Sequence, residues 1–429
     1  NGNSAWLTNN QQAVTSRLEG PMIETLYVDG FRSLLNFQIG LSQGLNVLVG
    51  PNGTGKSNFI TFLDFLGQIL ETDLNSAIAI AQGAGSVFSK ERFENNKAEL
   101  TFNVTGQIST KTLADRYIYM GNDDEDSEIA YSHTCNIQYI RSPPAVYISS
   151  ERLTLSSNSS DPINIYRSTR REDGRFISRC EIHPSDHPLT TALYRWNEDS
   201  IKSAGGRAEL LAHFCRPETS IINLLSGHAP EFAAPRVDMS RFRSINIDPS
   251  SARKPTPVGT RTEILPTGEG LAGALYKLER GEYFPFDAHR LMRRYRDSEE
   301  QTGLYRNIMS WCREVNGDIY SATIDLDFQE AYFRPMMKFY MNGKLEEFSL
   351  SRISDGTVKW LALVTVLHAS EHLSVIEEPE NFLHPFMQES FISLCRQLLD
   401  DDAERSIIIS THSPTLLDCC KPDELRIFE

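Results

Sequence analysis

Hydrophobic and polar positions follow two spacings along the chain, and these spacings predict strands and helices. Residues Glu24–Gly30 alternate and Gly44–Val49 are a short apolar run, so we expect a half-buried strand and then a fully buried one. Over Lys56–Leu70 large apolar residues recur at helical spacing, which predicts a helix with one buried side. Further strands are predicted at Glu99–Val104, Asn136–Ile140 and Ala145–Ser149.

The C-terminal part of the chain continues this alternation of strands and helices. The predicted strands are Ala322–Phe328, Phe333–Met341, Ser374–Ile376 and Ser406–Ser410, and the predicted helices are Asp355–Ser370, Pro385–Leu399 and Pro414–Cys420. The Asn342–Gly343 pair is typical of a hairpin turn. Strands that alternate with helices at both ends of the chain predict an α/β fold with a mostly parallel sheet and an added antiparallel β region.

The middle of the chain has a different texture. Prolines recur from about Ser150 to Gly317, with helical patches such as Leu189–Cys215 and Gly270–Arg280 between them. This density of proline excludes a long coiled coil and predicts a compact, mixed and mainly helical insertion. We therefore expect an N-terminal lobe over 22–150, an insertion over 151–317 and a C-terminal lobe over 318–429. The polar residues 1–21 are expected to be a flexible extension or a remnant of expression.

Composition indicates where in the cell the protein is expected. The longest apolar runs are too short to cross a bilayer, and the polar N-terminus has no signal-peptide pattern, so no membrane association is expected. The seven cysteines lack zinc spacing and point to a reducing, cytoplasmic location.

Net charge bears on nucleic acid as a partner. The whole chain carries −15, which does not attract DNA. Between Glu151 and Arg261, however, 16 lysines and arginines face 13 aspartates and glutamates, a balance of +3, so the rest of the chain carries −18. A solvated surface explains such a run equally well, but the middle of the chain is where a basic face is expected.

The most specific motif is GPNGTGKS at Gly50–Ser57, which follows an apolar strand and opens a helix. The glycines let backbone amides approach phosphates, Lys56 can reach the β- and γ-phosphates, and the Ser57 hydroxyl can ligate Mg²⁺. The sequence thus predicts a Walker A loop that binds ATP. The expected nucleotide-binding residues here are Asn52, Gly53, Thr54, Gly55, Lys56, Ser57 and Asn58.

Two further motifs follow strands near the C-terminus. The strand Ser374–Ile376 leads into the adjacent carboxylates Glu377 and Glu378, the pattern of a Walker B site. Glu377 is expected in the Mg²⁺ shell, and Glu378 is expected to orient or deprotonate the attacking water. His412 comes directly after the next strand, where it can donate a hydrogen bond to the γ-phosphate or the water.

A fourth motif precedes the carboxylates. In ISDGTVKW, Ser354 is expected to cap a helix whose first turn holds Asp355 and Gly356. A hydroxyl with free amides at a helix N-terminus makes an anion-binding surface, although in isolation the same pattern describes an ordinary capped helix.

The order of these motifs resembles the ABC-type ATPases of the RecF, SMC and OLD-like group, often classed with AAA-like ATP-binding domains. DGFRSL at Asp29–Leu34 is similar to the opening strand and turn of that group, and EEPENFLHP at Glu377–Pro385 is similar to its magnesium-site segment. The resemblance implies that Arg32 and Ser33 approach the nucleotide and that a glutamine contacts the metal. Gln82 is the candidate for that glutamine, with a surface turn as the equal alternative.

The resemblance also implies a partner and a function. Two heads would close on two ATP molecules, with Ser354, Asp355 and Gly356 of one subunit capping the ATP of the other, so a homodimer or higher oligomer is expected. By analogy with antiphage defence systems, a separate effector nuclease would act in trans, since only seventeen residues follow His412 and no nuclease site is visible. Closure would be coupled to that effector or to DNA. The alternatives are a RecF-like DNA-repair ATPase and an ATP-bound assembly scaffold with little turnover.

Overall fold

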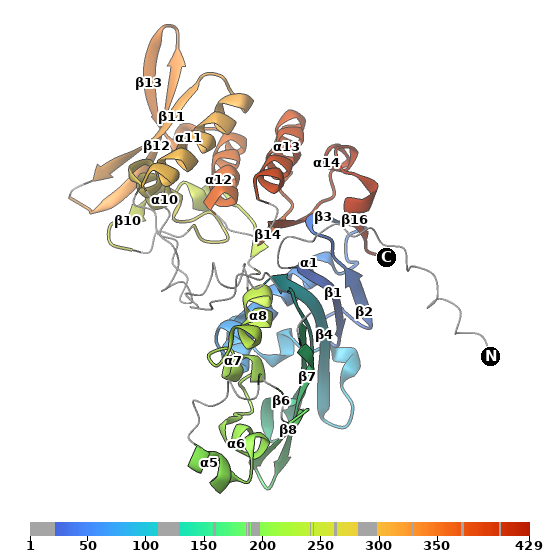
Figure 1. Ribbon diagram of the computed structural model, residues 1–429. Coiled ribbons are helices and arrows are strands. Elements are labelled where there is room, and N and C mark those ends of the chain that lie inside the picture. Colours follow the sequence, from blue (N-terminus) through green and yellow to red (C-terminus); the bar gives the residue numbers. More distant parts are fainter. Residues whose placement is uncertain are drawn as a thin grey trace.

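The computed structural model describes residues 22–109, 128–157, 160–185, 187, 189, 198–240, 242, 244–260, 264–281, 298–327, 329–369, 373–402 and 405–429. The N-terminal extension expected over 1–21 lies outside these residues. The described chain forms two lobes, and a parallel sheet lies where they meet (Figure 1).

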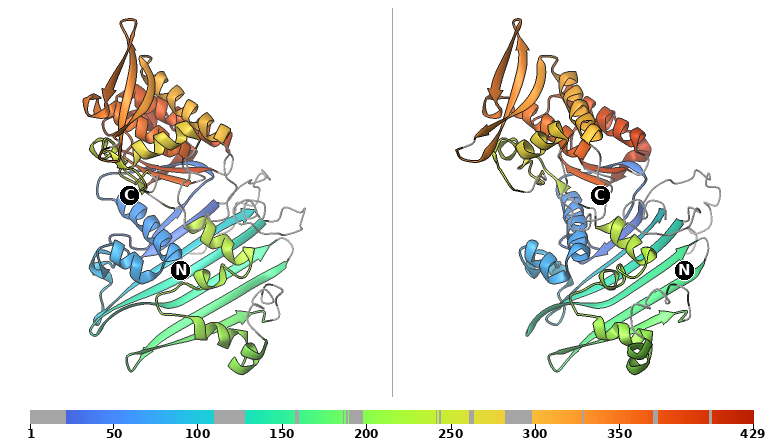
Figure 2. Two further views of the ribbon diagram at one scale, coloured as in Figure 1. Left: turned by 90° about the vertical axis from the view of Figure 1, so that its left-hand side faces the viewer. Right: turned by 60° about the vertical axis from the view of Figure 1, so that its left-hand side comes forward.

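The first lobe is built on a seven-stranded antiparallel sheet with the order β2-β1-β4-β5-β6-β7-β8. Its strands are β1 (Met22–Asp29), β2 (Phe37–Gly40), β4 (Lys97–Ser109), β5 (Glu128–Arg141), β6 (Pro144–Ser157), β7 (Ser160–Glu172) and β8 (Arg175–His183). Helices α1 (Lys56–Glu71), α2 (Leu74–Ile80), α5 (Glu198–Ala204), α6 (Arg207–Phe214), α7 (Ile221–Leu225) and α8 (Pro230–Met239) accompany it. Figure 2 shows the sheet as a broad plate with helices lying against it.

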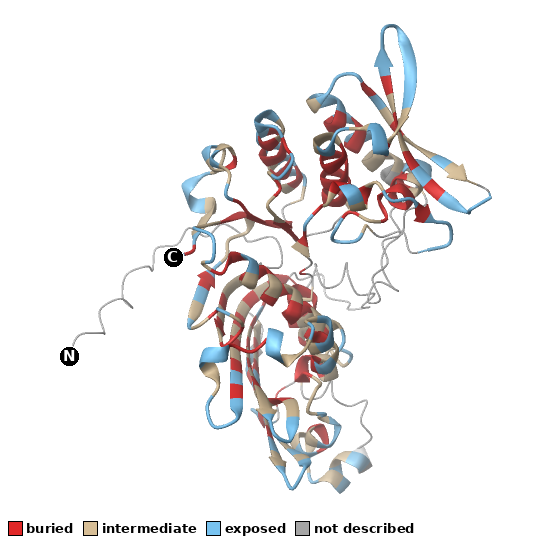
Figure 3. Ribbon diagram, turned by 180° about the vertical axis from the view of Figure 1, so that it is seen from behind, coloured by how far each residue is buried: buried red, intermediate tan, exposed pale blue. Residues whose placement is uncertain are grey.

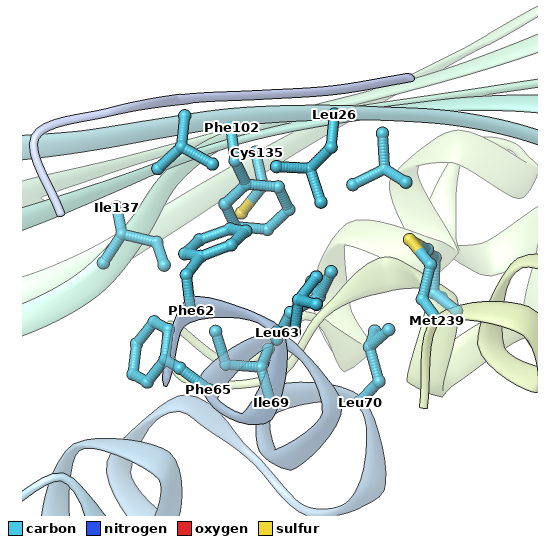
Figure 4. Packing of buried hydrophobic residues seen from close by; sticks show 14 of the residues in the cluster. Leu26, Phe62, Leu63, Phe65, Ile69, Leu70, Phe102, Cys135, Ile137 and Met239 are labelled. Atoms are coloured by element: carbon cyan, nitrogen blue, oxygen red, sulfur yellow. The ribbon is translucent and has the colours of Figure 1, made fainter. Parts of the chain in front are cut away.

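Helix α1 forms as predicted, and it joins the sheet to the rest of the fold. Phe62 and Leu63 point from α1 toward the sheet residues Leu26 and Phe102 (Figure 4). The ring centroids of Phe62 and Phe102 are 5.6 Å apart. The large apolar residues that recur at helical spacing along α1 are all buried. Their packing against the sheet fixes the position of α1 and of the loop that precedes it.

The middle of the chain begins differently from the expected insertion. Residue 151 lies inside β6, and β7 and β8 extend the same sheet by antiparallel pairing. The turn between them is Asp173–Gly174, with φ of 48° and 78°, a hairpin signal that the proline-based interpretation passed over. The helices α5 to α8 follow this hairpin in the described part of the segment.

The second sheet is parallel throughout, with the order β16-β3-β15-β14-β9. Its strands are β3 (Gly44–Val49), β9 (Ser244–Ile245), β14 (Leu373–Glu377), β15 (Ser406–Ser410) and β16 (Leu425–Ile427). Leu48 and Ile408 belong to the core of the first lobe, whereas Val47 and Ile409 belong to the core of the second. The sheet is therefore buried on both faces, as parallel sheets usually are. Its parallel pairings confirm the predicted mostly parallel sheet.

The second lobe surrounds the other face of the parallel sheet. It contains α9 (Pro249–Ala252), α10 (Leu271–Arg280), α11 (Ser298–Val315), α12 (Asp355–Ala369), α13 (Pro385–Asp401) and α14 (Pro414–Asp418). A small antiparallel sheet is formed by β10 (Thr256–Pro257), β11 (Ile319–Asp327), β12 (Tyr332–Met341) and β13 (Lys344–Ser349). The predicted turn at Asn342–Gly343 joins β12 to β13, a hairpin that projects with an exposed tip (Figure 3). Within the described residues, no helix has both the length and the apolar character needed to cross a bilayer.

Candidate ATP-binding and hydrolysis site

The candidate site lies where three parallel strands end side by side. Leu48 of β3 is paired with Ser410 of β15, and Ser410 is paired with Glu377 of β14. Because the strands are parallel, the segments that follow them leave the sheet at one edge. The fold thereby brings together the Walker A loop, the paired carboxylates and the histidine segment from distant parts of the sequence.

The Walker A loop depends on glycine at its two ends. A Cβ on Gly50 would lie 2.3 Å from the carbonyl oxygen of Phe428, so no other residue fits there. Gly55 has φ of 105° and is the N-cap of α1, and its Cβ would lie 3.2 Å from Leu34. No side chain caps this helix, so its first-turn amides point out of the N-terminus without an acceptor from the helix itself. That arrangement suits a phosphate group.

Lys56 is buried, with 5% of its surface exposed, although it carries the charge of the loop. Its Nζ donates to the carbonyl oxygens of Gly50 at 2.7 Å and Pro51 at 2.9 Å. Burial lowers the pKa of Lys56, and the nearby Glu378 carboxylate opposes that shift. The lysine thus lies folded over its own loop and within electrostatic reach of the Walker B carboxylate.

Arg32 and Ser33 lie against the start of α1. The Arg32 guanidinium donates to Asn58 Oδ1 at 3.4 Å and to Thr61 Oγ1 at 3.3 Å, and Asn58 Nδ2 donates to Ser33 Oγ at 2.6 Å. Arg32 also donates to the carbonyl of Ser86, and its φ is 48°. The β1 turn is therefore fastened to the helix that follows the phosphate loop. Asn58, expected to bind nucleotide, makes these two connections in this structure.

The paired carboxylates differ in surroundings. Burial, followed by the neighbouring charges of Asp64 and Glu378, raises the pKa of Glu377. Glu378 has φ of 42°, a left-handed backbone conformation that residues other than glycine rarely adopt. Its N–H donates to the Ser410 carbonyl at 2.9 Å, and its Oε2 accepts from Asn381 at 2.9 Å. Strained backbone of this kind occurs preferentially at functional sites.

The histidine segment meets the carboxylates directly. His412 Nε2 lies 4.0 Å from Glu378 Oε1, and both side chains are partly exposed. Glu380, which the sequence interpretation did not single out, holds this segment: its Oε1 accepts from Thr411 Oγ1 at 2.8 Å and from the His412 N–H at 2.7 Å. The third acidic residue of the Glu-Glu-Pro-Glu run was the available signal.

The signature motif begins a helix, as predicted. Ser354 Oγ accepts from the Thr357 N–H at 3.3 Å, and α12 starts at Asp355. Arg253, also missed from the sequence, holds the preceding turn by donating to the carbonyls of Leu350 at 2.8 Å and Ile353 at 2.7 Å. The same guanidinium lies 2.6 Å from the Asp355 carboxylate. The exposed Ser354 hydroxyl is thus presented on a fixed helix end.

Two further expectations from the sequence concern Gln82 and the signature residues 354–356. Gln82 is exposed, with φ of 64°, at the turn after α2. The residues that follow it contact Arg32: the Ser86 carbonyl accepts from its guanidinium, and the Val87 carbonyl accepts from its N–H at 2.8 Å. Among the described residues, no hydrogen bond or ion pair joins residues 354–356 to the Walker A loop.

A divalent cation fits the donors at the strand ends. Ser57 and Glu377 offer the hard oxygen ligands that Mg²⁺ prefers, and Mg²⁺ usually takes its remaining ligands from phosphate and water. Burial and then the neighbouring Asp64 and Glu378 carboxylates raise the pKa of Glu377, and a nearby cation would favour its charged form. Neither here nor at any other place in the described chain does a group of three or more histidine, cysteine, aspartate or glutamate side chains gather as a metal site.

Comparisons with known proteins agree with this assembly. The family described as "AAA ATPase domain" matches residues 22–175, and the family described as "AAA domain, putative AbiEii toxin, Type IV TA system" matches residues 250–418. The first segment holds the Walker A loop; the second holds the signature, the carboxylates and His412. The curated proteins give no match.

Solved structures similar to the chain include SMC heads. A crystal structure of the SmcHead bound to the C-winged helix domain of ScpA is 14% identical, with a TM-score of 0.45, and covers 93% of this chain and 92% of that one. The SMC head domain from Thermotoga maritima is 13% identical, with a TM-score of 0.35, and covers 94% of each chain. An Smc head domain with an extended coiled coil, bound to the C-terminal domain of ScpA derived from Pyrococcus furiosus, is 13% identical, with a TM-score of 0.38, and covers 93% and 92%.

Proposed function

We propose that this AAA-type ATPase, whose motifs follow the ABC order of the RecF, SMC and OLD-like group, is a switch that binds ATP, closes two copies of itself face to face and reopens on hydrolysis. The observation that carries the proposal is the convergence of Lys56, Glu378 and His412 at one sheet edge, with Glu378 within 4.0 Å of His412. The signature helix supports the two-copy arrangement, because its exposed Ser354 has no bond to its own Walker A loop within the described chain.

Each residue has a role that follows from its position. The open amides at the start of α1 and the Lys56 ammonium would bind the β- and γ-phosphates, once Lys56 exchanges its loop carbonyls for phosphate oxygens. Glu378 would accept a proton from water as the water oxygen bonds to the γ-phosphorus and the bond to the β-phosphate oxygen breaks, which yields ADP and phosphate. His412 would hydrogen-bond the transferring phosphoryl group.

Ser57 and Glu377 would hold Mg²⁺, which would neutralise charge on the β- and γ-phosphates. Its positive charge would also oppose the rise in the pKa of Glu377 that burial, and then Asp64 and Glu378, cause.

The family matched over residues 250–418 favours a place in defence. Its description names a toxin of a type IV toxin–antitoxin system, and this supports a defence ATPase that passes its nucleotide state to a separate effector over a DNA-repair ATPase. The nuclease effector and any DNA contact are part of the proposal.

Replacing Glu378 by glutamine tests the hydrolytic role. Gln keeps the size and hydrogen-bonding capacity but loses the base, so ATP turnover should fall by about a hundredfold or more. ATP affinity measured by calorimetry should remain, since Lys56 and the loop are intact. Glu99→Gln, an exposed carboxylate on the outer side of β4, is the matched control and should keep wild-type turnover. Turnover of Glu378→Gln at the wild-type rate would contradict the assignment.

A further inference from the structure

A buried lysine of the signature helix joins that helix to the Walker B turn. Lys359 lies in the second turn of α12 with 1% of its surface exposed. Charged side chains are almost never buried to this extent unless they are paired, because the loss of hydration is costly. Most other buried positions of α12, such as Leu363, are filled by apolar residues, and the buried Thr365 and His368 bond to carbonyls of their own helix. Packing alone therefore does not account for a lysine at this position.

The contacts of Lys359 converge on the Glu378 segment. Its Nζ donates to the carbonyl oxygen of Glu378 at 3.1 Å and lies 5.8 Å from the centre of the Phe382 ring. Burial lowers the pKa of Lys359 to about 8, and the nearby carboxylates of Glu380, Glu378 and Asp248 partly oppose that shift. The ammonium group thus has one hydrogen-bond acceptor, the Glu378 carbonyl, and lies within electrostatic range of carboxylates in the same turn and at the N-cap of α9.

The Glu378 peptide is held from both sides. β15 binds its N–H through the Ser410 carbonyl at 2.9 Å, and α12 binds its carbonyl through Lys359. This residue has φ of 42°, so its backbone needs such restraint to keep the carboxylate aimed at the site.

The first turn of α12 is packed against the same segment. A Cβ on Gly356 would lie 2.7 Å from the carbonyl oxygen of Phe382, so the signature turn and the segment after the carboxylates are in direct backbone contact. A shift of the signature turn is therefore transmitted to the Glu378 turn through contiguous packing and through the Lys359 hydrogen bond.

We infer that Lys359 is a positioning residue that sets the Glu378 backbone and couples it to the signature helix. If, as proposed above, the signature surface caps the ATP of a second copy, capping of the partner's nucleotide adjusts the catalytic carboxylate of the capping subunit. Each copy would then hydrolyse fastest when it also caps its partner. The positioning role of Lys359 is argued from its contacts, and its effect in a pair of copies rests on the proposed function.

The test uses the full chain with Lys359→Met, which fills the same volume without a donor or charge. Turnover should fall by about tenfold to a hundredfold, as expected for a misplaced catalytic group, while ATP affinity stays within about twofold. Leu363→Met, one turn further along the buried side of α12, is the control and should keep wild-type turnover. Because Met suits a buried site, thermal stability should not fall, which separates this role from packing.

The decisive comparison is the double variant Lys359→Met with Glu378→Gln. If Lys359 acts through Glu378, the double variant should be no slower than Glu378→Gln alone. A Lys359→Met protein with wild-type turnover, or a double variant slowed by the product of the two single effects, would overturn the inference. Normal turnover in Glu378→Gln alone would instead overturn the proposed function. If Lys359→Met does not fold, Lys359→Gln makes the same comparison, with a smaller loss because its amide can still donate.

Discussion

Single side chains of the site are restrained by hydrogen bonds within the chain. Lys56 is bound to two loop carbonyls, Arg32 is bound to α1, and Glu380 holds the His412 segment. Glu377 differs, since burial and neighbouring carboxylates raise its pKa. The proposed site therefore has two features that suit a nucleotide bound with a divalent cation: the open amides beside Lys56, and the carboxylates next to them.

Removing the Lys56 ammonium should weaken ATP binding. Lys56→Ala deletes the one cationic side chain of the Walker A loop and the two hydrogen bonds that close it. ATP affinity should fall by at least about tenfold, or about 1.4 kcal/mol. Titration calorimetry measures this, with the exposed Lys90→Ala as control. Unchanged affinity would remove this loop from the binding site.

The sequence predicted the residues that lie at strand ends and missed the residues that hold them. Ser57, Glu378 and His412 each follow an apolar strand, so local pattern was enough to nominate them. Arg253 contacts residues about a hundred positions away, and Glu380 contacts a segment about thirty positions away. Such partners are set by tertiary packing and leave no periodic signal near either residue.

Among the elements, α12 connects the signature to the catalytic turn, and its start depends on Arg253. The guanidinium binds the carbonyls of Leu350 and Ile353 and pairs with Asp355, so it fixes the backbone just before Ser354. The helix thus presents its hydroxyl and first-turn amides in one orientation.

Arg253→Ala should disorder the turn that holds Ser354 at the start of α12. The loss of bonds to two carbonyls should cost about 1–3 kcal/mol of unfolding free energy. Turnover should fall about tenfold, with ATP affinity of the separate subunit retained, because the Walker A loop does not contact this turn. Chemical denaturation and a coupled ATPase assay measure both effects, and the exposed neighbour Arg352→Ala is the control. Wild-type turnover in Arg253→Ala would mean that the signature turn is not used in hydrolysis.

Element prediction succeeded where one face of an element is apolar and was incomplete elsewhere. Helix α1 and strands β3 and β15 have continuous or periodic apolar patterns and appear as predicted. β7 and β8 have a polar outer face, and their inner face includes the buried Arg167 and Thr169, so alternation was obscured. The Asp173–Gly174 turn was the readable signal of that hairpin.

At the scale of the molecule, the β7–β8 hairpin exposes several arginines, interspersed with the exposed acidic residues Glu172, Asp173 and Glu181. Arg170, Arg175 and Arg179 are all exposed there, whereas Arg171 donates to the Pro143 carbonyl and lies 5.7 Å from the Phe176 ring. The first three are therefore the arginines available to a polyanion.

If the chain binds DNA, changing Arg170, Arg175 and Arg179 to Glu should weaken binding by about tenfold or more and flatten its salt dependence. The control changes Lys90, Lys97 and Lys344, also exposed, to Glu, which alters net charge equally. Fluorescence anisotropy at several salt concentrations makes the comparison. Equal losses in both triple variants would place any DNA contact elsewhere.

The central claim is that two copies close around ATP, with the Walker A loop of one facing the signature of the other. The most direct measurement is cross-linking between Asn52→Cys and Thr357→Cys in the Glu378→Gln background, with each single cysteine variant as a control for the native thiols. Asn52 is exposed on the loop, and Thr357 lies in the first turn of α12, next to Ser354. The account predicts cross-linked dimers in the presence of ATP and Mg²⁺, absent without nucleotide and abolished by adding Ser354→Arg. ATP bound by calorimetry without any such cross-link would contradict the face-to-face site and leave a nucleotide site completed within one chain.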